Sequence, residues 1–200
     1  MSTQVQNEFQ PKQGDALLIV DVQNDFLPGG SLAVPRGDEV VTVLNRYLDI
    51  FAMQNLPVYA TRDWHPEHHC SFRAQGGPWP PHCVAKTNGA AFAVALLLPP
   101  AAVIISKAMT VKQDAYSGFH GTDLHQKLHA AGIRRLFIGG LATDYCVLDT
   151  VRDALRLGYQ VLLLGDAIRA VDVQPGEGPR AEAEMTKLGA QRIAVEGVAA

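Results

Sequence analysis

Short apolar segments alternate with amphipathic segments along most of this 200-residue chain, and the alternation limits the folds open to it. Five apolar segments cover residues 16–22, 57–63, 101–107, 135–141 and 160–167, and a weaker sixth covers 191–195. They are rich in Val, Ile and Leu and lack a clean polar and apolar alternation. This pattern is typical of strands that are buried on both faces of a parallel sheet.

Helical patterns occupy the gaps between these segments. Residues 38–55 place apolar side chains at the spacing of one helical face, and residues 122–131, 144–157 and 178–188 do the same. Gly132 and Gly158 follow two of these segments, at the kind of position where helices often end. The pattern predicts an α/β fold with a single-domain, doubly wound and mainly parallel sheet of about six strands and helices on both faces.

The length of the chain leaves room for one domain with a sizeable core. We therefore expect residues 1–200 to form a single domain, in which residues 1–13 are an N-terminal extension. Residues 64–98 differ from the rest because they are rich in Pro, Gly, His and aromatic side chains. They indicate a long functional insertion after the second strand.

Composition excludes several classes of partner. The formal net charge of -3 offers no basic surface for nucleic acid. The longest apolar run, residues 90–105, is interrupted by Pro99 and Pro100 and is shorter than the ~20 residues of a membrane helix, so we expect no membrane contact. The first residues lack a secretory signal pattern, which predicts a cytoplasmic protein with a small-molecule or protein partner. Whether the chain forms a homo-oligomer stays open.

Polar residues close three of the predicted strands and follow a fourth. Asp21, Asp63 and Lys107 close the first three, while Cys146 follows the fourth at the start of a helix. Ligands of an open parallel sheet bind beyond the carboxyl ends of its strands. Each residue alone is more often an ordinary strand-end charge or a buried thiol, but their joint occurrence favours an active site.

Cys146 is one of three cysteines, an odd number that argues against a disulfide framework and leaves thiol chemistry open. With Thr143 or Asp144 as the N-cap, it would lie in a first helical turn, whose N–H groups and dipole favour an anion. We therefore expect an acidified thiol, with Lys107 as a second positive charge. The same N–H groups could hold an oxyanion. A core cysteine facing the sheet is the alternative, and the local sequence favours neither.

A cysteine nucleophile needs a base that takes its proton and an acid that protonates the departing amine. No histidine stands at a strand end, whereas Asp21 does. An aspartate held between Lys107 and the thiol could perform both transfers. Asp25 competes for this role, although it lies further into the loop, where aspartates more commonly form turns or caps.

A candidate metal site begins with Asp63 and His65, which an extended backbone would place on the same side. The insertion adds His68, His69 and His82, and imidazole with carboxylate suits one divalent ion of zinc, iron or manganese. His82 is the expected third ligand because the stiff segment PWPPHC could hold its imidazole in place. His69 is the next candidate. Cys83 is a rival ligand that would point the other way in an extended chain. A scattered surface cluster of histidines is the alternative to a metal site.

Five groups of motifs in the same order resemble those of nicotinamidases, within the isochorismatase-like hydrolases. They are DVQNDFLPGGSLAV (21–34), TRDWHPEHHCSF (61–72), WPPHCV (79–84), SKAM with DAYSGF (106–109 and 114–119) and GGLATDYCV (139–147). The resemblance spans nearly the whole chain and implies the same fold. It also implies the hydrolysis of nicotinamide to nicotinate and ammonia through a thioester, in NAD salvage, and the hydrolysis of pyrazinamide.

The resemblance assigns roles to individual residues. It implies a catalytic triad of Asp21, Lys107 and Cys146, and metal ligands Asp63, His65 and His82 with His69 near the metal. The amides of Ala142 and Cys146 would form the oxyanion hole, with a cis Leu141–Ala142 peptide. Phe26, Leu32, Trp79 and Tyr116 match positions around the substrate ring, and each could otherwise be plain core. Tyr145, which precedes the nucleophile, is also expected in this pocket; some nicotinamidases have histidine at its position, and Lys86 stands where glycine is frequent.

Other members of the superfamily are the rival enzymes. N-carbamoylsarcosine amidase-like and ureidoacrylate hydrolase-like enzymes share the triad but generally lack the metal set of Asp63, His65 and His82. Isochorismatases lack the cysteine nucleophile. A histidine-rich module that binds metal without catalysis is a further alternative, and the complete triad argues against it.

Overall fold

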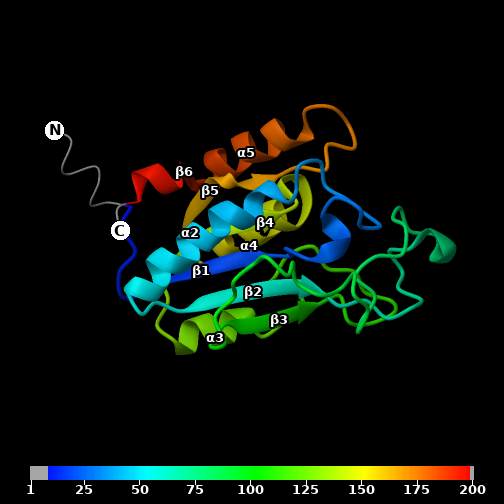
Figure 1. The fold of residues 1–200 in the computed structure, drawn as a ribbon, viewed down its shortest axis with the longest axis horizontal. Helices are drawn as coiled ribbons and strands as arrows, with labels where there is room; N and C mark the ends of the chain where they lie inside the picture. The colour runs from blue at the N-terminus through cyan, green and yellow to red at the C-terminus, as the bar shows by residue number, and fades with distance from the viewer. Residues whose placement is uncertain (1–8, 199–200) are drawn as a thin grey trace.

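A six-stranded parallel sheet forms the centre of the molecule in the computed structural model, which describes residues 9–198 (Figure 1). The strands are β1 (Asp15–Val20), β2 (Val58–Asp63), β3 (Val103–Lys107), β4 (Arg135–Leu141), β5 (Gln160–Arg169) and β6 (Gln191–Ile193). The helices are α2 (Glu39–Met53), α3 (Leu124–Ala130), α4 (Leu148–Arg156) and α5 (Glu177–Leu188). The predicted fold class is confirmed, and each predicted strand and helix overlaps an observed one.

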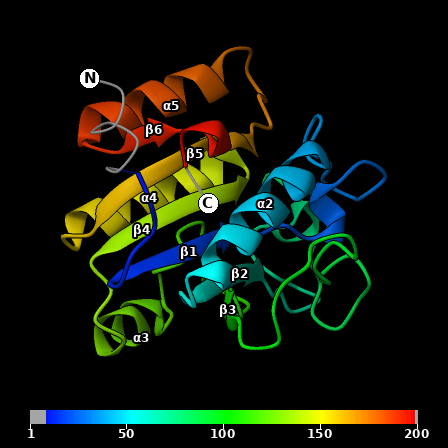
Figure 2. The same ribbon diagram turned by 60° about the vertical axis from the view of Figure 1, so that its left-hand side comes forward.

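Helices cover both faces of the sheet, as the alternation predicts (Figure 2). Leu17 and Ile19 of β1 pack in a cluster with residues of α2, whereas Leu18 packs on the opposite face in a cluster with residues of α3, α4 and α5. Successive strand side chains point to opposite faces, so a strand covered on both sides needs apolar residues at every position. All six residues of β1 are buried, which explains the unbroken apolar run from residue 16 to residue 20.

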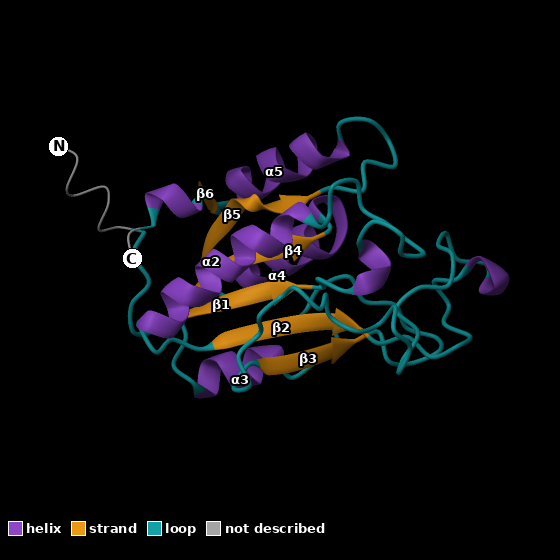
Figure 3. Ribbon diagram, viewed as in Figure 1, coloured by secondary structure: helices purple, strands orange, loops and turns teal. Residues whose placement is uncertain are grey.

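The order of the strands places the ends of β1 and β4 side by side. The sheet runs β3-β2-β1-β4-β5-β6, so the chain moves outward from β1 to β3 and then returns to β4 on the other side of β1. This reversal is the topological switch point of an open α/β sheet, where a crevice forms beyond the carboxyl ends. Loops gather at that end of the strands (Figure 3). The fold therefore predicts a site between the segments that follow β1 and β4.

The close contact of β1 and β4 depends on Gly140. A Cβ atom at this position would lie 2.0 Å from the carbonyl oxygen of Val20, and the φ angle of Gly140 is +127°. Only glycine adopts this conformation readily and leaves room for the neighbouring backbone. The register between β4 and β5 shifts at the same place, between Ile138 and Gly140. The switch point therefore has a sequence requirement that apolar patterning does not reveal.

The segment that follows β4 differs from the single helix predicted over 144–157. Thr143–Val147 form a π-helical turn, and the regular helix α4 begins only at Leu148. No side chain caps this turn, so the predicted N-cap role of Thr143 or Asp144 is wrong. The Asp144 carboxylate instead accepts hydrogen bonds from the N–H groups of Val171 and Asp172, at 2.9 and 2.8 Å. The Asp144 carboxylate therefore fastens the turn to the loop after β5 instead of capping it.

Two other predicted regions need comment. Within the apolar run 90–105, Ala90, Ala93 and Leu96 are buried, but Val94 is 94% exposed and Leu97 is 68% exposed, so only part of the run is core. Among the described residues, no helix has the length and apolarity needed to cross a membrane. Residues 1–8 of the predicted N-terminal extension lie outside the described part of the chain.

Candidate active site

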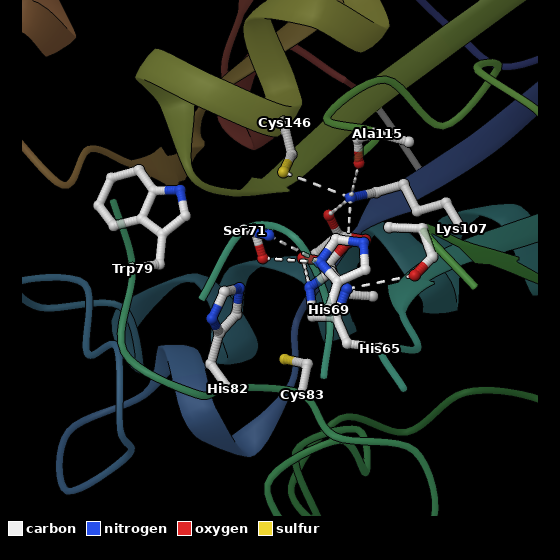
Figure 4. Close-up of polar contacts among 12 residues, drawn as sticks. His65, His69, Ser71, Trp79, His82, Cys83, Lys107, Ala115 and Cys146 are labelled. Atoms are coloured by element: carbon white, nitrogen blue, oxygen red, sulfur yellow. Dashed lines mark hydrogen bonds and ion pairs between the residues drawn. The ribbon is translucent and has the colours of Figure 1, made fainter. Parts of the chain in front are cut away.

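The ends of three neighbouring strands bring three charged side chains together near Cys146. Figure 4 shows the Lys107 ammonium beside the Cys146 sulfur. The ammonium of Lys107 lies 2.9 Å from Asp21 Oδ2, 2.5 Å from Asp63 Oδ1 and 3.4 Å from the Cys146 sulfur. It also donates to the carbonyl oxygen of Ala115 at 3.0 Å. The side chain of Lys107 is completely buried. The sequence predicted Asp21, Asp63, Lys107 and Cys146 at or just past strand ends. The sheet order places the other three side chains within reach of the Lys107 ammonium.

The two carboxylates keep Lys107 charged. Burial by itself would lower the pKa of the Lys107 ammonium, but the charges of Asp21 and Asp63 raise it well above its usual range. Burial would likewise raise the pKa of Asp63, yet Lys107 and His65 hold it below its usual range. For Asp21, burial outweighs the opposing charge of Lys107, so the pKa of this carboxyl is raised. Asp63 is therefore the permanent anion of the group, and Asp21 is the carboxyl suited to taking up a proton.

Cys146 differs from the expectation of an acidified thiol. Burial raises the pKa of Cys146 well above its usual range, and the nearby Lys107 opposes this rise without cancelling it. The predicted acidification is therefore wrong for the free thiol, because Cys146 is only 6% exposed and loses the solvation that a thiolate needs. The negative charge of Asp21 raises the pKa of the thiol further. The thiol thus keeps its proton until a base removes it.

Asp21 is oriented for that role by Thr61 on the neighbouring strand. The Thr61 hydroxyl donates to Asp21 Oδ1 at 2.6 Å, which leaves Oδ2 facing Lys107. Oδ2 has ion-pair contact with the ammonium but no well-aligned hydrogen bond within residues 9–198. The φ angle of Asp21 is +49°, an uncommon conformation for a residue other than glycine, which costs about 1–3 kcal/mol. Sequence reasoning missed Thr61 because it lies within a buried strand.

The rival base, Asp25, lies in a different environment. One of its carboxylate oxygens accepts the N–H of Cys83 at 2.7 Å, and the other accepts the N–H of Ser31 at 3.3 Å. Among described residues, the hydrogen bonds and ion pairs of Lys107 and Cys146 do not include it. The structure therefore separates the two aspartates that the sequence left in competition for proton transfer.

Gln23 connects the same loop to the metal-ligand region. Its side-chain amide accepts the N–H of Asp63 at 2.8 Å and donates to the carbonyl oxygen of Asp63 at the same distance. This pair of bonds continues the pairing of β1 with β2 past the end of β1, with a side chain in place of backbone. Gln23 is fully buried, and it fixes the backbone of the residue that touches Lys107. The sequence gives no signal for this role beyond the position of Gln23 near the end of β1.

Asp63, His65 and His82 form a buried group whose ligand atoms all lie within 4.8 Å of one another. His65 Nδ1 faces the carbonyl oxygen of Ala108 at 3.3 Å, and His82 Nδ1 faces that of Pro80 at 2.8 Å. An imidazole that donates from Nδ1 keeps a lone pair on Nε2, and histidine ligands of metals are usually held in this way by a carbonyl or carboxylate oxygen. His65 Nε2 is buried without a hydrogen-bond partner among the described residues. This unsatisfied nitrogen, with Asp63 beside it, fits a divalent metal ion.

His69 belongs to the layer behind these ligands. Its Nδ1 lies 2.7 Å from the Ser71 hydroxyl and its Nε2 lies 3.1 Å from the carbonyl oxygen of Gln113, so both nitrogens already have partners. The ring stacks on His65 with a centroid distance of 4.2 Å. His69 therefore supports the ring of His65 from behind. His68 is exposed, and Cys83 is buried outside the ligand group, which leaves His82 as the third candidate ligand.

A second cluster of ligand types, Asp21, Asp63 and Cys146, also lies within 4.8 Å. The Lys107 ammonium contacts all three of these side chains. It supplies the positive charge that a metal would otherwise bring, and a second cation beside it would be repelled. The charges around this cluster therefore suit thiol chemistry, whereas the His65 group suits metal binding.

A narrow cavity joins the two groups. Its empty volume is about 350 Å³, including the space at its mouth that is open to solvent. Its lining includes Cys146 and Ala142 on one side and Asp63 and His82 on another, with Phe26, Leu32, Trp79, Tyr116 and Tyr145 as the aromatic and aliphatic walls. Trp79 Nε1 donates to the Tyr116 hydroxyl at 3.0 Å. The ring of Tyr145 packs edge-on against that of Trp79, with 5.1 Å between the ring centroids. The Leu141–Ala142 peptide at the rim is cis, as expected.

Val171 completes the cavity and was missed by sequence reasoning. It follows β5 and lines the cavity, although it lies 25 positions beyond Cys146 in the chain. The hydrogen bond from its N–H to Asp144 holds it beside the turn that carries the cysteine. Nothing in the residues around Val171 marks it, because its role depends on a contact between two loops that are distant in the sequence.

Comparisons with known proteins agree with this arrangement. A family model described as "Isochorismatase domain" matches residues 15–196. The chain is 40% identical over 196 residues to the nicotinamidase of Escherichia coli (strain K12), which covers 88% of this chain and 92% of that protein. It is similar to the structure of pyrazinamidase of Pyrococcus horikoshii in complex with zinc, with a TM-score of 0.87 and 48% identity over 90% of this chain and 99% of that one. It is also similar to PnC1 from L. infantum in complex with nicotinate, with a TM-score of 0.88 and 37% identity over 95% and 97% of the two chains.

Proposed function

Since this chain belongs to the isochorismatase domain family, we propose that it is a nicotinamidase. Both its cavity and its relatives indicate this activity. The reaction is nicotinamide plus water giving nicotinate and ammonia. One observation supports it above the others: a single narrow cavity is lined at once by the Cys146 thiol and by the ligand residues Asp63 and His82. A flat pyridine carboxamide has both a ring nitrogen for the metal side and a carbonyl carbon for the thiol.

The first half of the reaction forms a thioester. Asp21 takes the proton of the Cys146 thiol, and the sulfur attacks the carboxamide carbon. The amides of Ala142 and Cys146 hold the oxyanion of the tetrahedral intermediate. Asp21 then gives its proton to the leaving nitrogen, and the C–N bond breaks to release ammonia. The raised pKa of the Asp21 carboxyl supports this double role, because a stronger base takes the thiol proton more readily.

The second half consumes the thioester. A water molecule gives a proton to Asp21 and attacks the thioester carbon, after which the C–S bond breaks. The product leaves as nicotinic acid, which ionises to nicotinate in water, and the proton returns from Asp21 to the Cys146 sulfur. Lys107 stays charged throughout and holds Asp21 beside the sulfur at every step, which the raised pKa of its ammonium supports.

Asp63, His65 and His82 would hold one divalent metal ion, with zinc, iron or manganese as the candidates. Such an ion supplies a Lewis-acidic anchor for the ring nitrogen of the substrate. The aromatic walls from Trp79 and Phe26 then keep the ring in the plane that presents its carboxamide to Cys146. Hydrolysis of pyrazinamide, which carries the same carboxamide, is part of the proposal. The single-domain extent of residues 1–200 and a cytoplasmic location stay predictions, and the oligomeric state stays open.

The test is the release of ammonia from nicotinamide by the purified chain supplied with zinc, iron or manganese. We expect turnover by the unaltered chain and none by Cys146→Ala, which should keep the same metal content because Cys146 is not in the His65 ligand group. Absence of ammonia with all three metals would overturn the proposed function. Normal turnover by Cys146→Ala would remove the cysteine from the nucleophile role.

A further inference from the structure

The loop after β1 reaches the candidate metal ligands through Asp25. The Asp25 carboxylate accepts the N–H of Cys83 at 2.7 Å, and Cys83 directly follows His82 in the chain. A hydrogen bond to a carboxylate is about twice as strong as one between neutral groups. The carboxylate also lies directly against the backbone of Gly89, where a Cβ atom would come within 2.1 Å of Asp25 Oδ2. Asp25 is thus closely fitted between Cys83 and Gly89.

Cys83 is the link between two of the ligands. Its carbonyl oxygen accepts the N–H of His65 at 3.0 Å, while its own N–H belongs to Asp25. The carbonyl of His65 in turn accepts the N–H of Ala85 at 2.8 Å. The φ angle of Cys83 is +46°, a conformation that a non-glycine residue keeps only when its surroundings enforce it. A rotation at Cys83 would therefore move His82 on one side and release His65 on the other.

The backbone around Asp25 is itself fixed. Its N–H donates to the carbonyl oxygen of Gly89 at 3.0 Å, and its carbonyl oxygen accepts the N–H of Leu32 at 3.0 Å. The carboxylate is thus held on both sides of its own peptide. Its position does not depend on Lys107 or Cys146, so it can act on the ligand geometry without taking part in proton transfer.

We propose that Asp25 is a positioning residue for the metal site, which holds Cys83 in its left-handed conformation and so keeps His65 and His82 in register for one ion. This inference rests on the proposed function, because it concerns the same metal site. It assigns to Asp25 a role separate from the base role for which the sequence made it a candidate. Asp25 acts through the backbone of Cys83 and touches neither the metal nor the substrate.

The test compares zinc affinity in three variants by competition with a chelator. Asp25→Asn keeps the size of the side chain but replaces one acceptor oxygen with an NH2 group, so one of the two N–H groups loses its partner. We expect zinc binding about 10–100-fold weaker, the usual loss when an outer-shell partner of a metal site is removed. Asp38→Asn is the matched control, because Asp38 is an exposed carboxylate that makes no side-chain cap. It should bind zinc as the unaltered chain does.

Gly89→Ala is the second variant, and it keeps the charge of Asp25. The new methyl group would displace the carboxylate from its position, so zinc affinity should fall here as well. This variant decides the matter if Asp25→Asn does not fold. The absorption spectrum of bound cobalt should also change in both variants, because it follows the geometry of the ligands.

Zinc affinity within twofold of the unaltered chain in every folded variant at these two positions would overturn the inference. Its failure is distinct from failure of the proposed function. A chain that loses zinc affinity on Asp25→Asn but never releases ammonia would support the positioning role and refute the amidase role. A chain that hydrolyses nicotinamide and binds zinc equally well with and without the Asp25 carboxylate would do the reverse.

Discussion

Replacing Lys107 with methionine tests the charge arrangement of the site most directly. Methionine keeps much of the length of the stem and removes the ammonium that contacts Asp21 at 2.9 Å and Asp63 at 2.5 Å. The two carboxylates are 0% and 6% exposed, so little water would replace the lost partner. The variant therefore leaves two buried carboxyl groups facing each other without a cation, once the metal has been removed with a chelator.

The expected cost follows from this burial. Breaking a buried ion pair by removing one partner costs about 3–5 kcal/mol of the free energy of unfolding. For a domain of this size, each kcal/mol lowers the melting temperature by about 2–4 °C, so we expect a loss of about 6–20 °C at pH 7. Lys112→Met is the control, because Lys112 is exposed, and it should change stability by less than about 0.5 kcal/mol.

The pH dependence gives the prediction its sign. Lys107 opposes the rise in the pKa of Asp21 and holds the pKa of Asp63 low, so its removal should raise the pKa of both carboxyls. A carboxyl whose folded-state pKa is raised binds more protons in the folded than in the unfolded state. Its stabilising contribution is complete below the unfolded pKa and is lost as the pH rises through the folded pKa. Lys107→Met should therefore be less destabilised at pH 5 than at pH 7.

Urea or thermal unfolding of the metal-free proteins at the two pH values measures both effects. Two results would refute the reasoning. One is a Lys107→Met variant that unfolds at the same temperature as the unaltered chain at pH 7. The other is a destabilisation that grows as the pH falls from 7 to 5, since that would mean that the carboxylates prefer to stay charged without Lys107.

Two further predictions concern Val171 and Gly140. Val171→Phe should raise the KM for nicotinamide about tenfold or more, which corresponds to about 1.4 kcal/mol, because the larger side chain narrows the cavity. Zinc affinity should not change. Val173→Phe is the control: Val173 is 52% exposed, and its replacement should leave KM unchanged. Equal KM values for both variants would remove Val171 from the pocket. Gly140→Ala should lower the free energy of unfolding, measured in urea, by about 1–3 kcal/mol from overpacking beyond the backbone strain. Gly158→Ala is the control for that strain, since no heavy atom lies within 4 Å of its added Cβ, and an equal loss in both variants would contradict the steric argument.

The order of strands and helices could be predicted because burial acts on every residue of a segment. A strand covered on both faces needs an unbroken apolar run, as residues 16–20 of β1 form, and a helix covered on one face needs the apolar spacing seen in α2. The regular helix after β4 was placed too early, since the turn that carries Cys146 is π-helical. Hydrophobic spacing does not distinguish such a turn from the first turn of α4.

The sequence by itself determined which chemical groups the site would contain. Asp21, Asp63, Lys107 and Cys146 stand at or just past strand ends, and parallel strands present their ends at one edge, so their meeting follows from the fold class. The tertiary structure alone decided their chemical state. Burial raises the pKa of the Cys146 thiol despite Lys107, because desolvation depends on all the segments packed around it.

Hydrogen-bond partners were likewise a matter for the tertiary structure. His69 has both ring nitrogens occupied by Ser71 and Gln113, and Asp25 holds Cys83 instead of the nucleophile. Gln113 lies more than forty positions from His69 in the chain, and Cys83 lies more than forty positions from Asp25. The local sequence around a side chain does not predict such distant hydrogen-bond partners. Residue type and spacing therefore fix what a group can do, while its burial and its distant partners fix what it does.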